Sequence, residues 1–338
     1  METAFLLSTI ANLLASGKGI LPADESLPTI GKRFAALAIP STEENRRGYR
    51  ELLFTTPGLN EFISGMILFD ETIHQKIDDV SIPEALSQKG IVPGIKVGLG
   101  TIPMPSFTGE KIIQGLDGLR ERLAAYRQLG ARFTKWRAVI GIGEGEPTAS
   151  CIGANAEALA LFAALSQETG LVPIVEPEVL MDGNHTLARC EGVIEATLHS
   201  VFTALFAHRV LFEGMLLKTG MVLSGKACPH QADAETVAAS TLRCLRRAVP
   251  AAVPGIVFLS GGQTDVAATE RLNAICRVGD APWKISFSYG RALQDEALKT
   301  WKGSSIKIIV AQAALRHRAQ CNGMALKGLY SVASEQAS

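Results

Sequence analysis

Ionisable side chains lie at the ends of several apolar runs in this chain of 338 residues. Lys218 closes the run 211–217, and Glu176 and Glu178 follow another apolar run. Removing an ion from water costs several kcal/mol even after relaxation, and burial favours the neutral form of an amine. A neutral lysine amine attacks carbonyl carbons and forms a Schiff base. Lys218 is therefore a candidate nucleophile, and a structural lysine paired with a carboxylate is the alternative.

Two pairs of charged residues have the spacing that places both members on one side of a strand. Glu176 and Glu178 are two residues apart, and so are Lys135 and Arg137. A carboxylate pair supplies one acid and one base, which imine formation and carbon–carbon cleavage both require. The pair could equally serve to neutralise Lys135 and Lys218. Lys135 and Arg137 together suit an anionic substrate.

Two glycine-containing motifs predict a phosphate site. One motif is Ser260-Gly261-Gly262, and the other is Ser288-Tyr289-Gly290-Arg291. Glycines let a phosphate approach backbone N–H donors closely, and an arginine adds a bidentate cation. A third match, Gly220 to Lys226, resembles a nucleotide-binding loop but has Ala227 where Ser or Thr would hold magnesium. We set this third match aside.

Short apolar runs alternate with longer segments of helical periodicity, which is typical of βα units around a parallel sheet. The runs predict eight strands, at 19–23, 63–69, 93–97, 133–140, 171–175, 211–217, 255–259 and 283–287. Helical patterns lie at 116–129, 155–168, 186–208, 233–249 and 265–278, and the last four of these follow the capping residues Asn155, Thr186, Asp233 and Asp265.

This order of elements predicts one domain over residues 1–338, a single (β/α)8 TIM barrel with extra N- and C-terminal helices. The extra helices are an amphipathic N-terminal segment and the pattern at 305–326. A doubly wound open sheet is the alternative. Residues 328–338 are small and polar and predict a short mobile tail. In a barrel the carboxyl ends of all strands meet at one face, where we expect the charged residues and glycine motifs to gather.

Composition excludes several classes of protein. Lys plus Arg and Asp plus Glu number 33 each, so the chain has no net charge to attract nucleic acid. No uninterrupted apolar run reaches the roughly 18 residues of a membrane span. The six cysteines form no Cys-x-x-Cys pair, the spacing that is typical of a zinc site. We therefore expect a cytoplasmic protein with reduced thiols, no metal site, and no membrane or nucleic-acid partner.

Nine segments along the chain resemble one family, the class I (Schiff-base) fructose-bisphosphate aldolases. They are Ile-Leu-Pro-Ala-Asp-Glu-Ser at 20–26, Ile-Leu-Phe-Asp-Glu-Thr at 67–72, Gly-Ile-Lys-Val at 94–97, Gln-Gly-Leu-Asp-Gly-Leu at 114–119, Lys-Trp-Arg at 135–137, Val-Glu-Pro-Glu at 175–178, Glu-Gly-Met-Leu-Leu-Lys at 213–218, Phe-Leu-Ser-Gly-Gly-Gln at 258–263 and Phe-Ser-Tyr-Gly-Arg-Ala-Leu at 287–293. The resemblance implies a (β/α)8 barrel and reversible aldol cleavage of D-fructose 1,6-bisphosphate to dihydroxyacetone phosphate and glyceraldehyde 3-phosphate. This reaction belongs to glycolysis and gluconeogenesis and needs neither metal nor cofactor.

The resemblance also implies a role for each charged residue. Lys218 would form the Schiff base, with Glu176 as general acid and base and Glu178 beside it. Asp24 would orient the substrate hydroxyls, and Lys135 would stabilise developing charge. The C1 phosphate would be held by Ser260, Gly261, Gly290 and Arg291, and the C6 phosphate by Ser26, Arg33, Lys96 and Arg137. Gly262 and Ser288 are further candidates for binding substrate phosphate.

Two departures from the family pattern lie on the C6 side, at Leu27-Pro28-Thr29 and at Gly98-Leu99. They leave open an aldolase that prefers another phosphorylated ketose, such as fructose 1-phosphate. A non-catalytic scaffold is the further alternative, although the lysine and its carboxylates are all present. The resemblance implies a homo-oligomer, commonly a tetramer. Tyr330 is too far from the chain end to be equated with the terminal tyrosine of longer family members.

Overall fold

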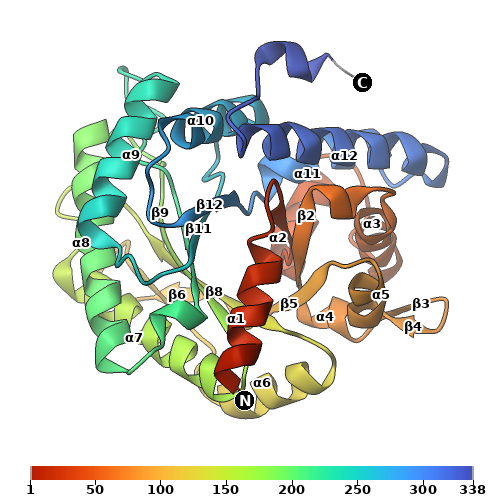
Figure 1. Cartoon of the computed structure of the whole chain (residues 1–338), viewed down its shortest axis with the longest axis horizontal. Helices are drawn as coiled ribbons and strands as arrows, with labels where there is room; N and C mark the ends of the chain where they lie inside the picture. The colour runs from red at the N-terminus through yellow and green to blue at the C-terminus, as the bar shows by residue number, and fades with distance from the viewer. Residues whose placement is uncertain (1, 337–338) are drawn as a thin grey trace.

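The computed structural model describes residues 2–336 and contains a ring of eight parallel strands (Figure 1). The strands follow one another around the sheet in chain order, from β1 to β12. Between the last and the first, Ser286 Oγ donates a hydrogen bond of 2.8 Å to the carbonyl of Lys18, which brings the two edges together. The eight strands are β1 (Gly19–Ala23), β2 (Ile63–Leu68), β5 (Val92–Lys96), β8 (Phe133–Ile140), β9 (Val172–Val179), β10 (Leu216–Thr219), β11 (Gly255–Phe258) and β12 (Lys284–Phe287).

Helices surround this barrel on its outer side (Figure 1). They are α2 (Leu27–Ala35), α3 (Glu43–Thr55), α4 (Asp70–Ile73), α5 (Ile82–Gln88), α6 (Leu119–Gln128), α7 (Ala149–Glu168), α8 (Leu187–Ala207), α9 (Ala234–Ala248), α10 (Asp265–Val278), α11 (Arg291–Trp301) and α12 (Ile308–Ala325). Two antiparallel hairpins interrupt the alternation, β3 (Lys76–Ile77) with β4 (Val80–Ser81), and β6 (Thr101–Pro103) with β7 (Lys111–Ile113). Four 3-10 turns complete the elements, η1 (Leu59–Glu61), η2 (Phe212–Gly214), η3 (Ser305–Lys307) and η4 (Val332–Glu335).

The N-terminal helix α1 (Glu2–Leu13) closes the amino-terminal end of the barrel. Leu6, Ile10 and Leu13 recur at helical spacing and are buried against inward side chains of the strands, Ile20, Ile67, Phe133, Val172, Ile174, Leu216 and Val257. A β-carbon on Gly65 would lie only 2.5 Å from the Leu13 side chain, so this contact requires glycine in β2. Because this end of the barrel is filled, only the carboxyl end of the strands is left for a ligand.

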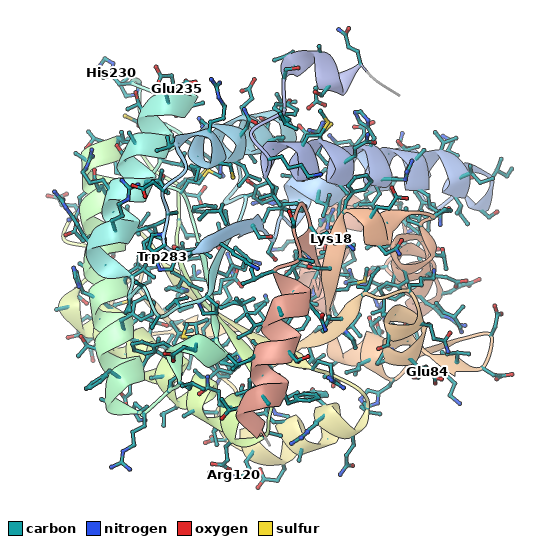
Figure 2. All side chains as sticks on the ribbon, viewed as in Figure 1. Lys18, Glu84, Arg120, His230, Glu235 and Trp283 are labelled. Atoms are coloured by element: carbon teal, nitrogen blue, oxygen red, sulfur yellow. The ribbon has the colours of Figure 1, made fainter. Side chains whose placement is uncertain are left out.

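The larger core lies between the strands and the outer helices, where side chains fill the space (Figure 2). Trp136 of β8 stacks on Phe162 of α7 with 5.6 Å between ring centroids. Helix α7 is also the one helix among the described residues that is long and apolar enough to cross a membrane. Its buried side chains, including Leu159 and Phe162, belong to the barrel core. Glu84, Arg120 and Glu235 mark the exposed outer edge in Figure 2.

The single (β/α)8 barrel and its eight strands are confirmed, and one predicted strand is misplaced. The run 211–217 was expected to be extended, but η2 occupies Phe212–Gly214 and β10 begins only at Leu216. The Gln167 side chain accepts a hydrogen bond from the Leu211 N–H and donates one to the Leu211 carbonyl. These are the two backbone groups that a strand would pair with its neighbour, which explains the late start.

Two of the four predicted helix caps are confirmed, Thr186 and Asp233, whose side chains accept from backbone N–H groups of the first turn. The other two are wrong. Helix α7 begins six residues before Asn155, at Ala149, because Thr148 caps it by accepting from the Cys151 N–H. Asn155 instead donates to the carbonyl of Lys111. Helix α10 is capped by Thr264, one residue before Asp265.

The segment after α12 packs back onto that helix. Arg318 of α12 binds Glu335, and Tyr330 donates its hydroxyl proton to the same carboxylate. Tyr330 is buried, and its N–H donates to Asn273 of α10. The predicted mobility of 328–338 stays a prediction, and residues 337–338 lie outside the described residues.

Candidate active site

Five of the eight strands bring ionisable side chains to the open end of the barrel. Asp24 directly follows β1, and Lys96 is the last residue of β5. In the sheet register Lys96 pairs with Lys135 of β8, and Arg137 of β8 pairs with Glu176 of β9. Lys218 lies on the next strand, β10. Inward side chains at matching heights therefore converge, as the fold class predicts.

Four of these side chains form a continuous chain of ion pairs. Lys218 Nζ lies 3.1 Å from Glu176 Oε1, and Lys135 Nζ lies 3.4 Å from Glu176 Oε2. Lys135 Nζ also lies 2.6 Å from Asp24 Oδ2. All four side chains are buried. Two ammonium groups thus alternate with two carboxylates, so that no buried charge is left without a partner.

The neighbours set the protonation of the two carboxyls. Burial by itself raises the pKa of Glu176, but Lys218 and Lys135 outweigh it and hold that pKa below its ordinary value. Burial likewise raises the pKa of Asp24, and the nearby lysines, Lys135 foremost, hold it well below the usual range. Burial lowers the pKa of Lys135, and Asp24 and Glu176 raise it by more. Asp24 and Glu176 are therefore proton acceptors at neutral pH, and Lys135 is a fixed cation.

A cavity of about 400 Å³ opens on one side of this chain of ion pairs and contains both glycine motifs. Gly261 and Gly262 have φ of +58° and +88°, the left-handed region that glycine adopts without strain. Gly290 precedes α11, whose N-terminal N–H groups favour an anion. The motif residues lining the cavity, together with Lys218, Glu176 and Glu178, are Ser260, Gly261, Gly262, Ser288, Gly290 and Arg291.

Two donors in this first cavity have no partner among residues 2–336. Ser288 Oγ is buried without a hydrogen bond. No hydrogen bond or ion pair of the Arg291 side chain is found in that part of the chain, and Arg291 is exposed. Buried polar groups are normally satisfied, so an orphaned hydroxyl beside a free guanidinium points to a ligand that completes both. A phosphate has the charge and the acceptor oxygens to do so.

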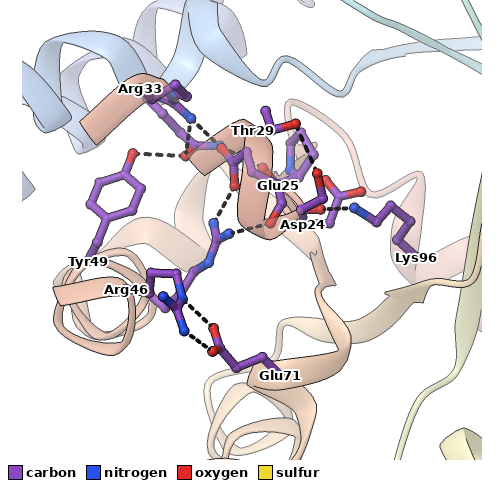
Figure 3. Close-up of polar contacts among 12 residues, drawn as sticks. Asp24, Glu25, Thr29, Arg33, Arg46, Tyr49, Glu71 and Lys96 are labelled. Carbon is purple, nitrogen blue, oxygen red and sulfur yellow. Dashed lines mark hydrogen bonds and ion pairs between the residues drawn. The ribbon is translucent and has the colours of Figure 1, made fainter. Parts of the chain in front are cut away.

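A second cavity, of about 960 Å³, opens on the other side and shares Asp24 and Arg137 with the first. Ser26, Lys96 and Lys135 line it. Lys96 Nζ donates to the Asp24 carbonyl and lies 4.7 Å from the centre of the Phe69 ring (Figure 3). Burial lowers the pKa of Lys96 to about 8, although the Asp24 carboxylate favours the charged form.

Arg33 lies apart from the group with which the sequence placed it. Its side chain binds Glu25 (Figure 3) and lies 3.0 Å from Asp295 of α11. Arg33 lines the first cavity, whereas Ser26 and Lys96 line the second. Arg137, in contrast, lines both cavities and binds Glu178 through its Nε. The structure thus separates four residues that sequence reasoning had grouped at one end of the substrate.

Three polar residues of the first cavity were missed in the sequence. Glu25 lies between Arg33 and Arg50 and binds both (Figure 3). Thr29 lines both cavities, and Lys32 lines the first. Thr29, Lys32 and Arg33 have the three- and four-residue spacing of one helix face, and Pro28 is favourable in the first turn of α2. This spacing was a readable signal, whereas the contacts of Glu25 depend on the packing of α2 against α3.

One cluster in residues 2–336 has metal-ligating atoms in mutual reach, and it is remote from both cavities. It consists of His317 and Cys321 on α12 and Glu335 in η4, and none of the three lines a cavity described above. The Glu335 carboxylate is already bound by Arg318 and Tyr330. The Arg318 guanidinium repels a second cation at the Glu335 carboxylate. We therefore interpret the contacts of Glu335 as holding the C-terminal segment against α12.

Comparison with known proteins agrees with this geometry. The family model described as fructose-bisphosphate aldolase class-I matches residues 6–338. A probable fructose-bisphosphate aldolase class 1 of Xanthomonas campestris is 55% identical over 330 residues, covering 97% of this chain and 99% of that protein. The cytosolic fructose-bisphosphate aldolase 4 of Arabidopsis thaliana is 47% identical, covering 98% and 84%. The fructose-bisphosphate aldolase of Plasmodium falciparum, solved in complex with TRAP and an inhibitor, superposes with a TM-score of 0.96 at 46% identity and covers 98% of this chain and 96% of that one.

Proposed function

Because this chain belongs to the class I fructose-bisphosphate aldolase family, we propose that Lys218 is the amine through which it cleaves its substrate. The protein catalyses the reversible cleavage of fructose 1,6-bisphosphate to dihydroxyacetone phosphate and glyceraldehyde 3-phosphate. The observation that carries the proposal is the position of Lys218 Nζ, buried in the barrel mouth and 3.1 Å from a carboxylate that can take its proton.

The first half of the reaction forms the imine. The neutral amine of Lys218 adds to the C2 carbonyl carbon of the ketose, and the carbonyl oxygen takes up a proton. Glu176 accepts the proton that leaves the nitrogen and returns a proton to the departing hydroxyl, which is lost as water. Asp24 accepts hydrogen bonds from the substrate hydroxyls, and Lys135 stabilises the negative charge that develops on oxygen.

The second half breaks the bond between C3 and C4. The C4 hydroxyl gives its proton to a carboxylate, Glu176 or its neighbour Glu178, as the electron pair of the bond moves into the iminium. Glyceraldehyde 3-phosphate leaves, and an enamine stays on Lys218. Protonation at C3 and hydrolysis of the resulting imine release dihydroxyacetone phosphate and restore the amine. The iminium is the electron sink, so the chemistry assigned to Lys218 uses no metal ion.

The two cavities suit the two phosphates of the substrate. In this proposal the C1 phosphate lies in the first cavity, against the N-terminus of α11, the glycines, Ser260, Ser288 and Arg291. The C6 phosphate lies in the second cavity, near Ser26 and Lys96, with Arg137 between the two. Arg33 lines the first cavity, where it orders α2 and α11 through Glu25 and Asp295.

Location and assembly are proposed from the relatives. The Arabidopsis relative is named as cytosolic, and we infer a cytoplasmic location for this chain. The family resemblance implies a homotetramer, which light scattering of the purified protein would test. A mass of one chain, 36.0 kDa, at micromolar concentration would contradict it.

Borohydride trapping tests the central proposal. The protein is incubated with dihydroxyacetone phosphate, reduced, digested and mapped by mass spectrometry. We expect one reduced adduct, on Lys218. An adduct on another lysine, or turnover without any adduct, would overturn the assignment of the nucleophile.

A further inference from the structure

The loop after β10 is locked to the loop after β9 by three backbone hydrogen bonds. The N–H groups of Gly225, Lys226 and Ala227 donate to the carbonyls of His185, Met181 and Gly183, each at 2.8 Å. A β-carbon on Gly225 would lie 2.4 Å from the Gly183 oxygen, so only glycine permits this approach. The segment 220–226, which the sequence could not assign to a nucleotide site, is therefore a rigid part of the barrel mouth.

These hydrogen bonds fix the backbone of Lys226, whose side chain reaches Gly262 in the lining of the first cavity. Lys226 Nζ lies 2.9 Å from Asp182 Oδ1. A β-carbon built on Gly262 would lie 2.9 Å from Lys226 Nζ and 3.5 Å from Arg291 Nη2. Two cations thus converge on one glycine of the phosphate-binding motif. Lys226 lies in the loop after β10, Gly262 lies in the loop after β11, and Arg291 begins α11.

The charges around Gly262 favour a dianion. Arg291 has no acidic partner in residues 2–336. Lys226 has one, Asp182, and that pair is half exposed, with 45% of the lysine side chain and 68% of the aspartate side chain accessible. An exposed pair is weak, so Lys226 can share or exchange Asp182 for a phosphate oxygen at little cost. Because Gly262 has no side chain, a phosphate oxygen has room to lie beside its backbone.

We propose that Lys226 is an additional substrate-binding residue that contacts the C1 phosphate beside Arg291, with Asp182 as its resting partner. The proposal rests on the placement of the C1 phosphate in the first cavity, as given under the proposed function. It predicts that loss of Lys226 raises KM for every substrate that carries the C1 phosphate. These substrates are fructose 1,6-bisphosphate, fructose 1-phosphate and dihydroxyacetone phosphate.

The test is Lys226→Met, assayed in the direction of aldol condensation, where each triose carries one phosphate. Dihydroxyacetone phosphate supplies the C1 phosphate and glyceraldehyde 3-phosphate supplies the C6 phosphate. We expect KM for dihydroxyacetone phosphate to rise about three- to fivefold, as loss of one partly exposed ionic contact predicts. KM for glyceraldehyde 3-phosphate should not change. The rise should shrink at high salt, because the contact is exposed to screening.

Lys76→Met, which removes the same charge from the exposed hairpin β3–β4, is the matched control and should leave both KM values at wild type. An unchanged KM for dihydroxyacetone phosphate in Lys226→Met would overturn the inference. An equal rise of KM for both trioses would also overturn it, because such a rise would indicate a nonspecific electrostatic effect or a structural defect. Borohydride trapping on Lys218 in the same preparations tests the proposed function separately, because it succeeds or fails independently of how KM moves.

Discussion

The two sides of the barrel mouth are built from different kinds of donor. The first cavity offers backbone N–H groups at glycines and a helix N-terminus, together with the Ser288 hydroxyl and the Arg291 guanidinium, neither of which has a partner within residues 2–336. In the second cavity the cations already have partners, since Lys96 donates to the Asp24 carbonyl and Arg137 binds Glu178. A phosphate in the first cavity meets hydrogen-bond donors that have no protein partner within those residues. A phosphate in the second cavity must share its donors with the protein groups that they already bind.

This difference predicts unequal contributions of the two phosphates to binding. Donors that are fixed in place before the substrate arrives cost no reorganisation, and they are worth more in a site that excludes water. We therefore expect the C1 phosphate to provide most of the affinity. The C6 side should tune the preference between fructose 1,6-bisphosphate and fructose 1-phosphate, and it is also where Leu27-Pro28-Thr29 departs from the family pattern.

The largest expected effect comes from Lys218, the residue proposed to form the imine. Lys218→Met should reduce kcat by roughly 10⁴-fold or more, because the imine cannot form. Circular dichroism and the unfolding midpoint should stay close to wild type, since methionine fills a similar volume and Glu176 keeps Lys135 as its partner. Substantial turnover by a correctly folded variant would exclude Lys218 as the nucleophile.

The next largest effect should come from weakening phosphate binding in the first cavity alone. Arg291→Met should raise KM for fructose 1,6-bisphosphate and for fructose 1-phosphate by the same factor, about 10- to 100-fold, because hydrogen bonds to charged groups contribute roughly 1.5–3 kcal/mol. Steady-state kinetics with both substrates gives the two factors. If KM rose for the bisphosphate alone, Arg291 would contact the C6 phosphate. The assignment of the two phosphates to the two cavities would then have to be reversed.

A smaller effect, a dependence of KM on pH, should arise from the second cavity and not from the first. The pKa of Lys96 is lowered to about 8 by burial, so this lysine is charged below pH 8 and neutral above it. Substrate phosphates have a second pKa of about 6 and stay dianionic across this window. KM for fructose 1,6-bisphosphate should therefore rise about threefold between pH 7 and pH 9, because the half-buried Lys96 loses its charge and its contact with the phosphate weakens.

Two comparisons sharpen this prediction. Fructose 1-phosphate has no C6 phosphate, and its KM should lack the rise. Lys96→Met should abolish the rise for the bisphosphate and hold its KM at the high value throughout. A rise that persists in Lys96→Met would assign the titration to another group.

The smallest expected effect is none. Cleavage activity should be indifferent to EDTA, because the iminium on Lys218 takes the electron pair that a metal ion would otherwise stabilise. A loss of activity that added zinc restores would contradict the mechanism. The cluster of His317, Cys321 and Glu335 would then be the first place to look for the ion.

The sequence by itself determined much of the barrel and most of the site. The alternation of apolar strands and amphipathic helices is a local pattern, and in a barrel of parallel strands every carboxyl end faces the same way. Lys135, Glu176 and Lys218 could therefore be expected at one face of the barrel, because each lies on or directly after a predicted strand. Caps such as Thr186 and Asp233 were equally readable, since capping depends on the first turn of one helix.

Tertiary structure decided the partners. Glu176 lies between two lysines, and Arg33 lines a different cavity from Lys96, because the sheet register and the packing of α2 place them there. Gln167 delays β10, and Lys226 reaches Gly262 only because two neighbouring loops are locked together. Each of these contacts joins residues that are far apart along the chain. Local sequence preferences carry no information about such distances, which follow only once the ring of strands has closed.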